Sequence, residues 1–238
     1  MNPRPESLSN TSVRTKQLTF ESRGKDIGID LVLPAVGGVR PAVLVLHGSG
    51  GISNLPEEIG ELANRGYITL IPHYFESTGT SWADLDSIRR HGLTWGQTLL
   101  DAVAFARRLP NVDPESIGLL GFSLGGYLAI AVAAHDRRIK CVAECFGGVP
   151  EKFLPSIEQL PPTLILHGED DKIVPVRHAL ELKQLCEKKG FHFEIELYPG
   201  AGHNFSGAFM RAAMARAMVF LNQRLQAQGS VHMFSSPA

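Results

Sequence analysis

Short apolar runs alternate with amphipathic stretches along this chain, and no other feature of the sequence constrains the fold more. The runs are nearly continuous in Val, Ile and Leu, without a polar residue at every second position; they lie at 42–47, 67–72, 116–122, 139–145 and 162–167. This pattern is typical of strands buried on both faces, which occur in parallel sheets covered by helices. The sequence therefore predicts an α/β fold with a mostly parallel central sheet flanked by helices.

Three further strands bring the expected sheet to about eight. Residues 16–22 and 26–34 alternate apolar and polar side chains around Gly24, which predicts an antiparallel pair at one edge of the sheet. Residues 192–198 form the last apolar run. Helical patterns separate the strands, at 55–66, 94–110, 124–135, 176–190 and 208–226.

The domain organisation follows from this alternation. The chain has 238 residues, which suits one large domain, and we place that domain at 15–227. Residues 1–14 are predicted to be a flexible arm and residues 228–238 a C-terminal tail. Residues 73–95 break the alternation and contain both tryptophans. Long connections of this kind are usually functional, so we expect a lid-like insert, although its aromatic residues could equally anchor a surface loop.

Composition restricts the partners. The net charge is −1, with 23 basic and 24 acidic residues, and nothing in the sequence indicates a nucleic-acid or membrane partner. Three cysteines give neither a disulfide framework nor a zinc spacing, and they read as buried small residues in a reducing compartment. The N-terminal stretch has no apolar core of a signal peptide. We therefore expect a cytoplasmic location; the oligomeric state is not readable from the sequence.

A candidate nucleophile lies at Ser123, in the stretch "GFSLGG" (121–126). This stretch fits G-x-S-x-G, with a predicted strand before it and a predicted helix after it. Glycines two residues to either side allow the tight bend that lifts the serine Oγ clear of the sheet. The alternative is a glycine bend that only serves the packing of helix against strand.

Serine needs a base, and the base needs a carboxylate. His203 lies in the glycine-rich stretch "YPGAGHNF", between the last strand and the last helix, where the imidazole could reach the sheet edge. Three acids, Glu169, Asp170 and Asp171, follow the strand at 162–167, and spacing alone does not choose among them. The order serine, acid, histidine is the order expected of α/β-hydrolases.

An oxyanion hole would need two backbone N–H donors. One is expected from Leu124, directly after the serine, and the other from Ser49 in the glycine-rich loop after the strand at 42–47. This loop lacks G-x-G-x-x-G and the G-K-[ST] ending of a phosphate-binding loop. No cluster of His, Cys and acidic residues has a metal-ligand spacing, so neither a metal nor an organic cofactor is expected.

Four stretches, "LHGSGG", "GFSLGG", "HGEDDKIVP" and "YPGAGHNF", together resemble the α/β-hydrolase superfamily and, within it, the dienelactone hydrolase family. The resemblance extends from about residue 16 to about residue 226, and it implies the α/β-hydrolase fold. The family acid lies in G-x-x-D-x-x-V-P, here residues 168–175, which selects Asp171. His203 matches the family base, and Ser49 and Leu124 match the usual oxyanion donors.

The chain also departs from the family pattern. Such enzymes typically carry Cys where this chain has Ser123, and a Glu that activates the Cys where this chain has Gly48. The two changes agree, since a serine activated directly by histidine needs no such Glu. The arginines that grip the substrate carboxylate in the family have no counterpart at the matching positions, which offer Glu76, Ser77 and Gly207. Arg89 and Arg90 lie in the insert and are the candidates to substitute for them, although a solvated position is the favoured interpretation.

These features predict a serine hydrolase that cleaves a small-molecule carboxylic ester or lactone through an acyl-enzyme intermediate. Tyr74, Phe75, Trp82 and Phe205 are the candidates for the pocket wall. A peptidase-like amidase, a thioesterase or an acyltransferase could use the same three residues. A hydrolase fold that only binds a ligand is a further alternative, against which the complete set of three residues argues.

Overall fold

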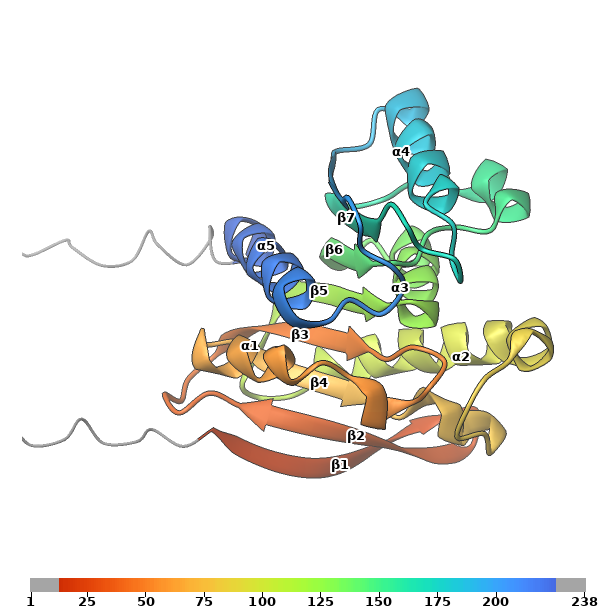
Figure 1. The fold of residues 1–238 in the computed structure, drawn as a ribbon. Coiled ribbons are helices and arrows are strands. Elements are labelled where there is room, and N and C mark those ends of the chain that lie inside the picture. The colour runs from red at the N-terminus through yellow and green to blue at the C-terminus, as the bar shows by residue number, and fades with distance from the viewer. Residues whose placement is uncertain (1–12, 226–238) are drawn as a thin grey trace, which may run out of the picture.

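The computed structural model describes residues 13–225, and these residues form one eight-stranded sheet (Figure 1). The strands are β1 (Arg14–Ser22), β2 (Lys25–Leu33), β3 (Arg40–Leu46), β4 (Ile68–Pro72), β5 (Val112–Phe122), β6 (Ile139–Cys145), β7 (Thr163–Gly168) and β8 (Phe193–Tyr198). Their order across the sheet is β1-β2-β4-β3-β5-β6-β7-β8. β1 and β2 pair antiparallel, β2 pairs antiparallel with β4, and all later pairs are parallel. The predicted α/β fold and its antiparallel edge pair are confirmed.

Helices cover both faces of the sheet. The α-helices are α1 (Gly60–Asn64), α2 (Leu85–Ala106), α3 (Leu124–His135), α4 (Arg177–Lys189) and α5 (Gly207–Leu225). Short 3₁₀ helices lie at η1 (Ile52–Asn54), η2 (Glu57–Ile59), η3 (Tyr74–Thr78) and η4 (Glu151–Ser156). In the described part of the chain, no helix combines the length and apolar character that crossing a membrane requires.

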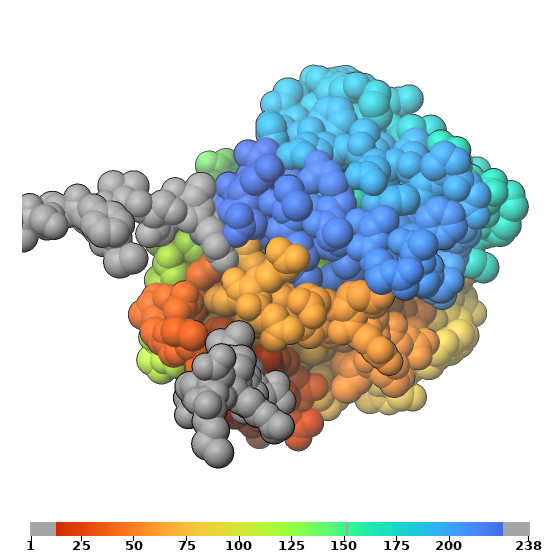
Figure 2. Space-filling view, turned by 60° about the vertical axis from the view of Figure 1, so that its left-hand side comes forward, coloured from red at the N-terminus to blue at the C-terminus, as the bar shows by residue number. Residues whose placement is uncertain are grey.

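Successive residues of β3 show why its apolar run is continuous. Leu44 and Leu46 belong to the core on the side of α2, α3 and α4, whereas Val43 and Val45 belong to the core on the side of α1 and α5. All four side chains are fully buried. Figure 2 shows α5 beside the η2–α1 segment on the second of these faces. A strand that contributes to two cores therefore carries few polar side chains in its middle.

The predicted insert at 73–95 differs most from the structure. Residues 74–78 form η3, and α2 already begins at Leu85 and runs for 22 residues. The side chain of Asp84 caps α2 by accepting the backbone N–H of Ser87 at 2.8 Å. This cap was a sequence signal for the helix start. Gly92 and Gly96 obscured the helical pattern that follows this cap, because glycine disfavours the helix.

The predicted ends of the domain are only partly covered by the structure. β1 begins at Arg14, so the last residue of the predicted arm is a strand residue, paired with Leu33. Residues 1–12 of the arm and the whole predicted tail at 228–238 lie outside the described residues.

Candidate active site

Ser123 occupies a strained turn between β5 and α3. Its backbone has φ 53° and ψ −118°, a region that non-glycine residues rarely adopt. A Cβ on Gly121 would lie 2.3 Å from the carbonyl oxygen of Gly125, and a Cβ on Gly125 would lie 2.1 Å from the carbonyl oxygen of Leu46. Both separations are far below van der Waals contact, so the bend requires glycine at both positions. The G-x-S-x-G spacing therefore has the physical purpose inferred from the sequence.

The Ser123 side chain is the first member of a hydrogen-bonded line of three residues. Its Oγ lies 2.9 Å from Nε2 of His203. The other ring nitrogen of His203, Nδ1, lies 2.7 Å from Oδ2 of Asp171. The Asp171 side chain is fully buried and that of His203 is 9% exposed, so water screens the contact weakly. The three residues come from loops that follow β5, β7 and β8, as their positions in the sequence predict.

The turn after β7 determines which of the three acids reaches His203. Glu169 and Asp170 are exposed, whereas Asp171 is buried. Oδ1 of Asp171 accepts the backbone N–H groups of Ile173 and Val174, both at 2.8 Å. These two bonds fix the carboxylate so that Oδ2 faces the imidazole.

The loop that carries His203 is attached directly to the end of β7. The backbone N–H of Asp170 donates to the carbonyl of Ala201 at 3.0 Å. A Cβ on Gly168 would lie 2.3 Å from that same carbonyl oxygen, so only glycine permits this approach. The acid turn and the histidine loop are thus held as one unit.

Backbone strain is concentrated around this line of residues. Within residues 13–225, four non-glycine residues have positive φ, and three of them are Ser123, Phe146 and Asn204. Asn204 directly follows His203, and the Phe146 ring packs edge-to-face against the imidazole with centroids 5.2 Å apart. Such strain persists only where surrounding contacts impose it, and it is characteristic of active sites.

Two candidate oxyanion donors flank Ser123. Leu124 is the first residue of α3, so its N–H lies at the positive end of the helix dipole. Ser49 lies next to Gly48, and a Cβ on Gly48 would come within 4.0 Å of the Ser123 Oγ. Among the described residues, neither the N–H of Ser49 nor that of Leu124 donates a hydrogen bond. Both donors are therefore available to a ligand.

The stacked rings of His47 and Tyr74 support the loop that carries Ser49 from the side of the core. His47 lies at the end of β3, its ring stacks on Tyr74 at 4.0 Å, and its Nδ1 lies 2.8 Å from the carbonyl oxygen of Gly48. The Tyr74 hydroxyl donates to the His47 carbonyl at 2.7 Å. Burial lowers the pKa of His47 to about 4, so the ring is neutral at pH 7. His47 is thus a structural residue that supports the loop after β3.

The four residues predicted to form the pocket wall divide into buried and exposed positions. Tyr74 is fully buried and Phe75 is 4% exposed, and both pack around His47 in the core. Phe205 is 6% exposed and packs against Phe146, which in turn contacts His203. Trp82 is 60% exposed. It precedes Ala83, whose N–H donates to the Ser49 carbonyl at 2.9 Å.

Glu144, which the sequence pattern did not single out, is a buried acid near the serine turn. Its side chain points from β6 towards the first turn of α3, where Oε2 lies 2.8 Å from the N–H of Gly147 and against Gly126. Its Oε1 has no hydrogen-bond partner within the described residues. Burial raises the pKa of Glu144 to about 8, so the carboxyl is mostly protonated at pH 7. The signal was a single acid inside the apolar run at 139–145.

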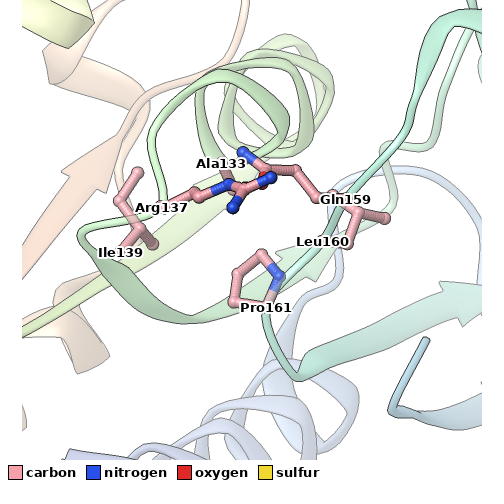
Figure 3. Close-up of a pocket in the computed structure, with 6 residues that line it drawn as sticks. All are labelled: Ala133, Arg137, Ile139, Gln159, Leu160 and Pro161. Atoms are coloured by element: carbon pink, nitrogen blue, oxygen red, sulfur yellow. The ribbon is translucent and has the colours of Figure 1, made fainter.

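The opposite end of the sheet offers a hollow without comparable chemistry. Figure 3 shows it near the starts of β6 and β7, where Arg137 donates a hydrogen bond to Gln159 above Pro161. Ser123 follows the other end of β5. Across residues 13–225, no group of three or more His, Cys, Asp or Glu side chains is placed to hold a metal ion.

The mostly parallel sheet, with its serine turn after a central strand, has the architecture of the α/β-hydrolases. The sequence profile named Dienelactone hydrolase family matches residues 31–218. The chain therefore belongs to the dienelactone hydrolase family, and it is a hydrolase that acts on ester bonds.

One curated relative and two solved structures illustrate what this chain is similar to. A Synechocystis protein named "Putative carboxymethylenebutenolidase" is 25% identical over 217 residues, which cover 81% of this chain and 87% of that protein. A dienelactone hydrolase-like promiscuous phosphotriesterase from metagenomic libraries has a similar structure, with a TM-score of 0.76 and 17% identity, over 90% of this chain and 98% of that chain. The acylaminoacyl peptidase of Pyrococcus horikoshii has a TM-score of 0.75 and 16% identity, over 95% of this chain and 43% of that chain. At these identities the two structures show a shared fold only.

Proposed function

We propose that this chain is a serine hydrolase that cleaves carboxylic ester or lactone bonds through an acyl-enzyme intermediate. The observation that carries the proposal is the continuous line from the Ser123 Oγ through His203 to Asp171, with separations of 2.9 and 2.7 Å. A nucleophile, a base and an orienting carboxylate in hydrogen-bond contact are the parts that acyl transfer requires. The serine itself lies on a strained turn, in a backbone region that non-glycine residues rarely adopt.

In the proposed mechanism, the Ser123 Oγ attacks the ester carbonyl carbon while His203 Nε2 accepts the hydroxyl proton. Asp171 holds the other nitrogen, Nδ1, in its protonated form and stabilises the imidazolium. The tetrahedral intermediate collapses, its carbon–oxygen bond to the alcohol breaks, and His203 gives the proton to the leaving alkoxide. Water then attacks the acyl-enzyme with His203 as the base again. The acid is released and the Ser123 hydroxyl is restored.

The backbone N–H groups of Leu124 and Ser49 are the proposed oxyanion hole. Leu124 directly follows the nucleophile, Ser49 is the neighbour of Gly48, which lies beside the nucleophile, and neither N–H donates a hydrogen bond among the described residues. Removing one such donor in other hydrolases costs about 3 kcal/mol of transition-state stabilisation. The helix dipole of α3 adds to the stabilisation at Leu124.

The substrate is proposed to be an uncharged ester or lactone with an apolar portion. Trp82, beside the Ser49 loop, and Phe205, beside Phe146, are the proposed wall residues that reach the substrate. Tyr74 and Phe75 lie in the core behind the loop and support it through His47. Arg89 is largely exposed and lies 3.4 Å from Asp86, which leaves it solvated on α2 as the sequence indicated. This arrangement favours a substrate without a carboxylate.

Amide, thioester or acyl-transfer chemistry remains the alternative for the same three residues, and the fold is shared with the acylaminoacyl peptidase named above. We also propose a cytoplasmic location, supported by Cys141, Cys145 and Cys186, which are all buried free thiols.

A matched substrate panel tests the proposal. The purified chain should hydrolyse p-nitrophenyl acetate and butyrate faster than the matched anilide or thioester, and Ser123→Ala should abolish the activity. His73→Gln is a suitable control, because His73 is a partly buried histidine that contacts Asp30 and Glu76 rather than the serine turn. Faster cleavage of the anilide would replace the esterase assignment by an amidase. Equal activity of Ser123→Ala and the wild type would refute the mechanism.

A further inference from the structure

His167 is a second histidine in contact with the acid of the proposed triad. It lies in β7 directly before Gly168, and its side chain is fully buried. Its Nε2 lies 2.8 Å from the carbonyl oxygen of Val174 and 3.5 Å from Oδ2 of Asp171. Its Nδ1 is buried and has no hydrogen-bond partner within residues 13–225.

The contacts of His167 define its tautomer. The Val174 carbonyl can only accept, so the proton of the ring lies on Nε2 and Nδ1 carries the lone pair. Burial lowers the pKa of His167, which keeps the ring neutral. The single N–H of this ring therefore points at Val174, with the carboxylate of Asp171 alongside.

This hydrogen bond holds the turn that orients the acid. Val174 is fixed through its carbonyl by His167, and it donates its own N–H to Oδ1 of Asp171 at 2.8 Å. Oδ1 is thereby occupied, and Oδ2 is the oxygen left to accept Nδ1–H of His203. A continuous chain of hydrogen bonds thus runs from His167 through the acid turn to Ser123.

We propose that His167 is a positioning residue, which holds the Asp171 turn so that Oδ2 aligns with His203. The proposal rests on the proposed serine-hydrolase function. His167 is not a catalytic residue, because its buried ring acts through Asp171 rather than on a substrate. His167 lies one residue before the end of β7 and His47 directly follows β3, but the ring of His47 supports the Ser49 loop instead.

Two substitutions of similar polarity separate positioning from simple burial. In His167→Gln, the amide nitrogen reaches the place of Nε2 and can still donate to Val174. In His167→Asn, the shorter side chain cannot reach that carbonyl. His167→Leu removes the donor altogether and serves as the second disrupting variant. His73→Gln, away from the acid turn, controls for replacing a partly buried histidine.

We expect His167→Asn to lower kcat about 100-fold, the loss that an error of about 1 Å in alignment can cause, and to change KM less than twofold. The kcat of His167→Gln should remain within about threefold of the wild-type value, because the hydrogen bond to Val174 is preserved. A displaced carboxylate stabilises the His203 imidazolium less, so the acidic limb of the kcat/KM profile should move to lower pH in the Asn and Leu variants.

The proton NMR signal of Nδ1–H in His203 gives a readout that does not depend on activity. Bonded to Asp171, it should resonate far downfield in the wild type and in His167→Gln, and it should shift upfield or disappear in His167→Asn and His167→Leu. If both disrupting variants fold with an unchanged signal, pH profile and kcat, His167 is only a core residue and the proposal is wrong. If the signal responds to the His167 variants as expected but Ser123→Ala leaves the ester activity unchanged, the proposed function fails while the positioning of Asp171 by His167 stands.

Discussion

Replacing Glu144 by glutamine should make the protein more stable at neutral and alkaline pH. The Glu144 side chain is fully buried under the first turn of α3, and burial raises its pKa from 4.5 to about 8. Between these two values, the folded protein keeps a proton on Glu144 that the unfolded chain releases. The free energy of unfolding therefore falls as the pH rises through this window and stops falling above the folded pKa.

The magnitude follows from the pKa change itself. A rise from 4.5 to about 8 corresponds to about 5 kcal/mol, of which about 3 kcal/mol is already lost at pH 7. Glutamine has no proton to lose in this range, and its amide oxygen can still accept the N–H of Gly147. The variant should thus equal the wild type at low pH and exceed it in stability as the pH rises.

Urea denaturation at a series of pH values from about 4 to about 9 measures the effect. The difference in unfolding free energy between Glu144→Gln and the wild type should grow from near zero to several kcal/mol. Glu21→Gln, at an exposed position in β1, is the matched control and should follow the wild-type curve. Parallel curves for Glu144→Gln and the wild type would show that Glu144 titrates alike in the folded and unfolded states, which would refute the reasoning.

Three further substitutions test the turn, the acid and the wall. Gly125→Ala would place a Cβ 2.1 Å from the Leu46 carbonyl oxygen; it should destabilise the fold by about 3 kcal/mol or more, and an unchanged Tm would contradict the close approach. Asp171→Asn should lower kcat about 10⁴-fold with little loss of stability, measured by ester hydrolysis and thermal unfolding; near-normal kcat would exclude Asp171 as the acid. Trp82→Ala should weaken binding of an apolar ester by about 1 kcal/mol, seen as a raised KM; an unchanged KM would place Trp82 outside the pocket.

The sheet and the serine turn were predictable because their signals are local. A strand that faces two cores carries mostly apolar side chains, and Val43 to Leu46 of β3 show this directly. The serine turn needs glycine on both sides because Gly121 and Gly125 touch backbone atoms. In each case the geometric demand falls on a few neighbouring residues, and the sequence displays it.

Other parts depend on contacts between distant segments. Glu169, Asp170 and Asp171 are equivalent by spacing, and only the fold of the turn buries the last of them. Tyr74 and Phe75 follow a strand end as a pocket wall could, but their rings turn into the core against His47. Sequence periodicity carries no information on which way such side chains point.

The most direct test of the account is covalent labelling of the proposed nucleophile. The wild-type chain, treated with a fluorophosphonate, should gain the mass of one phosphonyl group, and tandem mass spectrometry should place it on Ser123. Ser123→Ala should remain unlabelled, and Asp171→Asn should be labelled far more slowly. Labelling of Ser123→Ala, or a folded wild-type chain left unlabelled where another serine hydrolase reacts fully, would contradict the assignment of Ser123 as an activated nucleophile.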